Sequence, residues 1–133
     1  MEFVKVEALG NDFIVLEGHT APDAVDVVRW CARKRGVGAD GVLLVDPRGP
    51  GTVGMRYWNA DGGEAEMCGN GLRCVARLAL DRGWAIDDRV VIETAAGPLE
   101  ARVLEDGSVR ALVGRPAKSR VEQLLVAGAT VHP

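Results

Sequence analysis

Side-chain amides are scarce in this sequence, which holds thirteen arginines but only three asparagines and one glutamine. The asparagines are Asn11, Asn59 and Asn70, and each lies in a glycine-flanked or loop-like stretch. Asparagine favours turns, which accounts for one of them more readily than for all three. An amide also offers both donors and an acceptor to a polar ligand. We therefore expect the three asparagines to mark a ligand-binding site.

The sequence also lacks basic runs, long apolar runs and the pattern of an export signal. Its net charge is only -3, so neither nucleic acid nor an anionic membrane surface is an expected partner. The longest apolar runs are far too short to cross a bilayer. Residues 1–5 do not have the composition of a signal peptide, and we expect a cytoplasmic protein.

Cysteine is the third residue type in short supply. The three cysteines are an odd number without C-x-x-C spacing, which argues against a disulfide framework. A zinc site would have to combine Cys31, Cys68 and Cys74 with the two histidines, His19 and His132. None of these spacings is typical of zinc ligands, so we expect no metal.

Hydrophobic residues make up 47% of the 133, enough for the core of one ordinary domain. Short apolar runs between turn signals predict strands, and a 3.6-residue period predicts two helices. The order ββαββαβββ is typical of a mixed α+β domain with a strongly twisted sheet around the second helix. The predicted strands are 3–8, 13–16, 42–45, 53–58, 89–94, 99–104, 108–113 and, in addition, 121–126, and the predicted helices are 22–35 and 72–82.

Cys68 is the candidate reactive residue. A predicted strand over 53–58 leads into its loop, and apolar residues at helical spacing follow from Leu72, which places Cys68 at or just before a helix start. Gly69 and Gly71 let the backbone there lie close to a ligand. Free N–H groups at a helix N-terminus stabilise an anion, either a bound carboxylate or a thiolate. A buried core cysteine is the alternative, but the polar, glycine-rich surroundings favour the reactive one.

A second glycine-rich loop, over 35–41, precedes the predicted strand 42–45. It lacks the Lys-Ser/Thr pair of a P-loop, and nucleotide motifs require the strand before the loop. We therefore do not expect nucleotide binding.

Three segments together resemble diaminopimelate epimerase, the cofactor-independent amino-acid epimerase of lysine and cell-wall synthesis. They are Gly-Asn-Asp-Phe at 10–13, Gly-Val-Gly-Ala-Asp-Gly at 36–41 and, above all, the stretch 59–74, with Met-Cys-Gly-Asn-Gly-Leu-Arg-Cys at its end. The resemblance runs in order and spacing from residue 3 to about residue 113. It implies two similar α/β halves, each a barrel-like sheet around a central helix, with the substrate between them. It also implies that the substrate-binding residues are Asn11, Asn59, Gly69 and Asn70, that Cys68 is the catalytic cysteine of the first half, and that no cofactor is needed. Some members carry glutamine as a further substrate contact where this chain has Gly41.

The second half of that family, with its own cysteine motif and an Arg-Glu pair, has no counterpart in this sequence. Cys74 lies six residues after Cys68, about 240° away around the same helix, and does not replace the second cysteine. We assign 1–117 to the first half-domain and 118–133 to a linker and the start of the second half. The resemblance implies interconversion of LL- and meso-diaminopimelate by two cysteines. We expect this half alone to be inactive and to self-associate, with a homodimer as the form to test.

Three other interpretations remain. A proline racemase-like enzyme shares the Met-Cys-Gly motif, but Asn70, Arg73 and the turn at 10–13 argue against it. The phenazine-biosynthesis isomerase-like group shares the implied fold but lacks the cysteine. A non-catalytic half-domain that binds an amino acid or a second polypeptide is the alternative outside enzymes.

Overall fold

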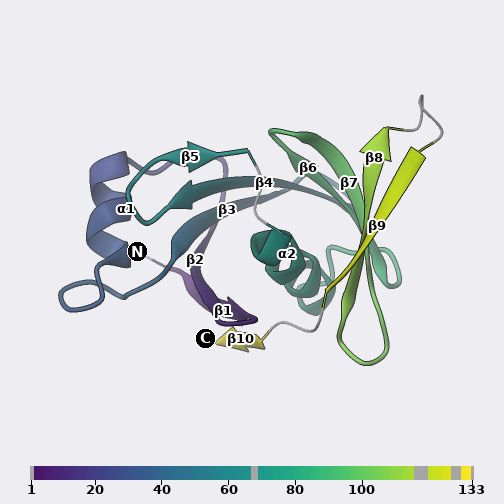
Figure 1. The fold of residues 1–133 in the computed structure, drawn as a ribbon, viewed down its shortest axis with the longest axis horizontal. Helices are drawn as coiled ribbons and strands as arrows, with labels where there is room; N and C mark the ends of the chain where they lie inside the picture. The colour runs from purple at the N-terminus through teal and green to yellow at the C-terminus, as the bar shows by residue number, and fades with distance from the viewer. Residues whose placement is uncertain (1, 67–68, 116–119, 127–129, 133) are drawn as a thin grey trace.

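The fold is one strongly curved sheet with a helix inside the curve and another outside it (Figure 1). The computed structural model describes residues 2–66, 69–115, 120–126 and 130–132. Within them lie the strands β1 Val4–Ala8, β2 Asn11–Glu17, β3 Gly41–Pro47, β4 Thr52–Asn59, β5 Glu64–Ala65, β6 Arg89–Thr94, β7 Gly97–Val103, β8 Val109–Arg115, β9 Arg120–Val126 and β10 Thr130–His132, and the helices α1 Ala24–Cys31 and α2 Gly69–Asp81.

The strand order is β10-β1-β2-β3-β4-β6-β7-β8-β9, with β5 paired to β4. Two neighbouring pairs are parallel, β2 with β3 and β4 with β6, and each is connected through a helix. α1 joins the first pair and lies on the outer face, whereas α2 joins the second and lies inside the curve (Figure 1). The predicted fold, a mixed twisted sheet wrapped around a central helix, is confirmed.

The central strands explain why the sequence has continuous apolar runs instead of a clean alternation. On β3, Leu43 and Val45 pack with α2 in the inner core, while Val42 and Leu44 pack in the outer cluster that includes Val27 of α1. Strands buried on both faces read as unbroken apolar stretches. Each face of the sheet therefore packs into its own hydrophobic core, the inner one with α2 and the outer one with α1.

The first turn is tighter than predicted. Only Leu9 and Gly10 form it, with φ of 48° and 85°, and Ala8 already pairs with Asn11. Positive φ at both central residues is the geometry of a type I′ hairpin, which suits the twist of the strands. Asn11 and Asp12 therefore belong to β2, where they pair with Ala8 and Glu7 of β1.

Helix α1 is shorter than the predicted 22–35 and ends at Cys31. The chain then turns back, so that the N–H groups of Gly36 and Gly38 donate to the carbonyls of Ala32 and Trp30 at 2.9 and 3.0 Å. A Cβ on Gly36 would lie 2.1 Å from a helix carbonyl oxygen, so this return requires glycine. The loop that resembles a phosphate loop is thus the cap of α1 and the entry to β3.

Helix α2 supplies much of the inner core. Its residues Leu72, Val75 and Ala79 are at most 1% exposed, which confirms the predicted apolar face. Gly83, at φ 77°, follows the helix and caps it, and its N–H donates to the Leu80 carbonyl. β5 and β10 were not predicted because they are only two and three residues long. β9 pairs with β8 and β10 with β1, and the domain boundary at residue 117 stays a prediction.

Candidate active site

The four predicted substrate-binding residues lie at one end of the sheet. Asn11 opens β2 and Asn59 closes β4, and since β2 and β3 run parallel and β4 antiparallel to them, both asparagines reach the same end. Gly69 and Asn70 open α2. Cys68, the predicted catalytic residue, lies outside the described residues, immediately before Gly69.

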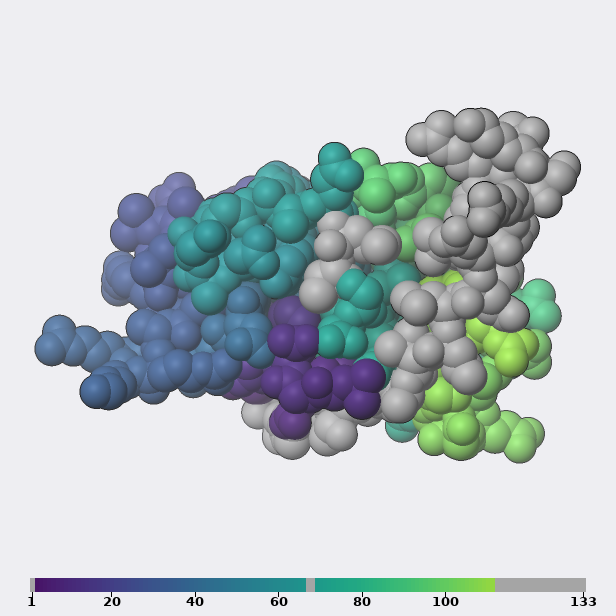
Figure 2. Space-filling view, viewed as in Figure 1, coloured from purple at the N-terminus to yellow at the C-terminus, as the bar shows by residue number. Residues whose placement is uncertain are grey.

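A direct hydrogen bond connects two of these residues across 59 positions of sequence. The Asn70 Nδ2 group donates to Asn11 Oδ1. In Figure 2 the purple atoms of the N-terminal hairpin lie beside the teal atoms of the start of α2. The start of the helix is therefore tied to the start of β2, with neither residue fully buried.

Behind Asn11 lies a network of balanced charges. Asn11 Nδ2 donates to Asp40 Oδ2 at 3.1 Å. Arg33 donates to both oxygens of Asp12, at 2.7 and 2.8 Å, and to Asp40 Oδ1 at 3.2 Å. Lys5 Nζ lies 3.0 Å from Asp12 Oδ2, so two cations face two carboxylates. The hydrogen bonds from Arg33, with those from Lys5, hold the pKa of Asp12 well below its usual range.

Asn59 is held from another direction. The Tyr57 hydroxyl donates to Asn59 Oδ1 at 2.8 Å, and the Tyr57 ring packs edge-on against Phe13, with centroids 5.8 Å apart. The two residues lie at i and i+2 on β4, which puts their side chains on one face. Neither Tyr57 nor Asp40 has a role that was predicted from the sequence. The sequence did offer one signal for Tyr57, which is the chain's single tyrosine and lies two residues before one of its three asparagines.

Gly41 leaves no room for a side chain. It pairs with Phe13 on one side and Asn59 on the other. A Cβ there would lie 2.5 Å from Cε1 of Tyr57 and 2.6 Å from the Trp58 carbonyl oxygen. A glutamine at this position would displace the ring that holds Asn59.

The described cysteines lie in separate cores. Cys31, the last residue of α1, is in the outer cluster, and burial raises the pKa of its thiol. Cys74 is 1% exposed in the inner core. Among the described residues there is no group of three or more residues arranged to hold a metal ion. Arg73 is fully buried beside Cys74, and no described group accepts a hydrogen bond from its guanidinium, whose pKa burial lowers.

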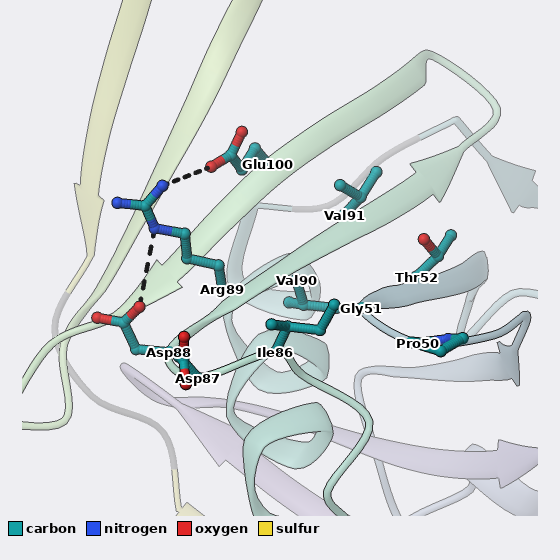
Figure 3. Close-up of a pocket in the computed structure, with 10 residues that line it drawn as sticks. All are labelled: Pro50, Gly51, Thr52, Ile86, Asp87, Asp88, Arg89, Val90, Val91 and Glu100. Carbon is teal, nitrogen blue, oxygen red and sulfur yellow. Dashed lines mark ion pairs between the residues drawn. The ribbon is translucent and has the colours of Figure 1, made fainter.

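A groove elsewhere on the sheet is a weaker candidate (Figure 3). It lies around Thr52, at the opposite end of β4 from Asn59, roughly 23 Å away at about 3.3 Å per residue. Three of its charged side chains pair with one another, Arg89 with Asp88 and Glu100 at 3.8 and 3.9 Å. No residue predicted to bind a ligand lines it.

Comparison with known proteins finds relatives over nearly the whole chain. The model of the family described as diaminopimelate epimerase matches residues 3–119. A diaminopimelate epimerase of Desulforudis audaxviator is 43% identical over 129 residues, which cover 92% of this chain and 46% of that protein. One from Moorella thermoacetica is 40% identical over 136 residues, covering 96% and 48%. The chain thus spans about half the length of these relatives.

Solved structures show the same fold at low identity. A phenazine biosynthesis protein of the PhzF family from Enterococcus faecalis superposes with a TM-score of 0.62 at 15% identity, over 85% of this chain and 44% of its own. A probable proline racemase from Agrobacterium radiobacter gives 0.62 at 20%, over 83% and 40%. These likenesses show the fold alone.

In the described part of the chain no helix is long and apolar enough to span a membrane. The family match and the sequence identities together show that this chain belongs to the diaminopimelate epimerase family.

Proposed function

We propose that this chain forms one half of a cofactor-independent epimerase that interconverts LL- and meso-diaminopimelate, a step of lysine and peptidoglycan synthesis. The observation that carries the proposal is the hydrogen bond from Asn70 to Asn11. It joins the start of β2 to the start of α2, at the residues that directly follow Cys68 in the sequence. A ligand held by these amides would lie at the start of α2, two residues after the cysteine in the sequence.

The polarity of the site favours a carboxylate-bearing ligand. The side-chain oxygens of Asn11 and Asn59 already accept hydrogen bonds from Asn70 and Tyr57, respectively. An amide nitrogen has two N–H groups, so Asn11 and Asn70 each retain one beyond the bonds described here, and Asn59 retains both. Backbone N–H groups at the start of α2 add further donors and a favourable dipole. The nearby charges of Lys5, Arg33, Asp12 and Asp40 balance, so recognition rests on neutral donors.

The chemistry assigned to Cys68 is removal or return of the α-proton on one face of the substrate. As a thiolate it takes the proton, an S–H bond forms, and the electron pair of the Cα–H bond moves into the carboxylate, where N–H donors stabilise it. An acid on the opposite face must then deliver a proton to Cα. Cys74 and Cys31 are buried in the two cores and do not serve that face. The second acid is therefore assigned to a complementary half.

The test is exchange in heavy water with the chain alone and with a complement. The 133-residue chain, incubated with diaminopimelate, is expected to show no epimerisation and at most weak α-deuterium uptake, because one base cannot serve two faces. Co-expression with the remaining part of the Moorella thermoacetica relative is expected to restore epimerisation. Cys68→Ser should abolish the restored activity, whereas Cys74→Ser, a buried control, should retain it.

Three results would redirect the proposal. Epimerisation by the chain alone, with its mass confirmed, would refute the two-base mechanism. Restored activity on free proline and not on diaminopimelate would favour a proline racemase-like enzyme. Tight binding of diaminopimelate with no exchange in the complemented protein would favour a non-catalytic binding half-domain.

A further inference from the structure

The hydrogen bonds from Asp40 through Asn11 to Asn70 have a single direction. An ionised carboxylate only accepts hydrogen bonds, so the edge of Asn11 that faces Asp40 must be its NH₂ group. The Asn11 oxygen then faces Asn70, and Asn70 must in turn present its NH₂ group to that oxygen. The observed contacts follow this order, with Asn11 Nδ2 at 3.1 Å from Asp40 Oδ2.

Asp40 itself is anchored on both oxygens. Its Oδ2 also accepts from the backbone N–H of Asp12 at 3.0 Å, and its Oδ1 accepts from Arg33 at 3.2 Å. Its own backbone N–H donates to the Asp12 carbonyl at 2.9 Å. The carboxylate therefore does not rotate freely. A neutral side chain in its place could both donate and accept, and would impose no direction.

We propose that Asp40 is a positioning residue that sets the orientation of both site amides, Asn11 directly and Asn70 through Asn11. This rests on the proposed function, in which these amides contact the substrate. With the carboxylate present, one N–H of Asn11 and the oxygen of Asn70 stay available to the ligand. Without it, each amide has two orientations of comparable energy. If half the molecules hold the wrong one, apparent affinity falls about twofold, and further if the wrong one is preferred.

Nuclear magnetic resonance tests the orientation in the unmodified protein. Scalar coupling across a hydrogen bond links the donor nitrogen to the acceptor carbonyl carbon. Coupling from Asn70 Nδ2 to Asn11 Cγ is the expected result, and coupling from Asn11 Nδ2 to Asn70 Cγ would overturn the proposal. With three asparagines and one glutamine in the chain, only four side-chain amide groups need assignment.

The matched variants are Asp40→Asn and Asp46→Asn. Asp46 pairs with Arg48 at 3.4 Å, away from the amides, and serves as the control. Asp40→Asn should shift the side-chain signals of both Asn11 and Asn70, whereas the control should leave them in place. An Asp40 variant with an intact backbone spectrum that shifts Asn11 alone would refute transmission to Asn70. If that variant does not fold, the coupling in the unmodified protein still decides.

Titration with meso-diaminopimelate separates this proposal from the proposed function. A ligand response at the amides of the unmodified protein without the predicted coupling would overturn the positioning role of Asp40 and leave the function standing. The coupling without any ligand response would support the positioning role and count against the function. Both together, with at least twofold weaker binding by Asp40→Asn and full rescue by Asp40→Glu, is the result we expect.

Discussion

Replacing Leu72 tests whether the sheet is built around α2. Leu72 is 1% exposed in the inner core, whereas Leu9, at the tip of the first hairpin, is 67% exposed. Truncation of a fully buried leucine to alanine costs about 3–5 kcal/mol, from lost transfer energy and the cavity left behind. A domain of this size has a free energy of unfolding of about 5–15 kcal/mol, so Leu72→Ala should fold but lose a large fraction of its stability.

Leu72→Asp adds a buried carboxylate without a partner, which costs several kcal/mol more, and should leave the domain unfolded. The assay is urea unfolding followed by far-UV circular dichroism. With a slope of about 2 kcal/mol/M, Leu72→Ala should lower the midpoint by roughly 1.5–2.5 M. Leu9→Asp is the matched control, and it should be neutral, because aspartate tolerates the positive φ of 48° found there. A soluble Leu72→Asp protein with an unchanged midpoint would refute the packing of α2.

Three further predictions concern reactivity, pH and packing at the site. In site-resolved alkylation followed by mass spectrometry, Cys68 should react fastest, because Cys31 and Cys74 are 4% and 1% exposed. Asp12→Asn should lower the free energy of unfolding by about 1–2 kcal/mol at pH 7. This figure is kept small because Arg33 is half exposed and solvent screens its ion pair with Asp12. The depressed pKa of Asp12 stabilises the fold above the unfolded value of about 3.9, so the deficit should shrink as pH falls below about 4. Gly41→Ala should cost about 1–3 kcal/mol in denaturant midpoint measurements, since its Cβ would lie 2.5 Å from the Tyr57 ring.

Each of these has a contrary outcome. Faster labelling of Cys31 or Cys74 in the folded protein would remove Cys68 from the proposed role. A deficit of Asp12→Asn that grows in acid would show that the carboxylate is not stabilised by its cations. A Gly41→Ala protein as stable as the original would show that the Tyr57 ring moves aside at no cost.

Local periodicity predicted most of the helices and strands. Particular residues show why some predicted boundaries differ from those in the structure. The apolar face from Leu72 onward and the stop at Gly83 depend on contacts within a few residues, so the sequence suffices for them. Helix α1 ends at Cys31 because the loop containing Gly36 returns onto its last carbonyls. β10 exists by pairing with β1, and its three residues carry no periodic signal of their own.

The sequence by itself also determined the family and the candidate residues, because Cys68 and the three asparagines sit in motifs that need no tertiary context to be identified. What only the tertiary structure decided is how those side chains are oriented. Asn11 forms hydrogen bonds with Asn70, 59 positions away in the sequence, and with Asp40, 29 positions away. These contacts result from strand register and the placement of α2. An amide presents a donor or an acceptor according to its neighbours, so the polarity of the site is a property of the packed chain.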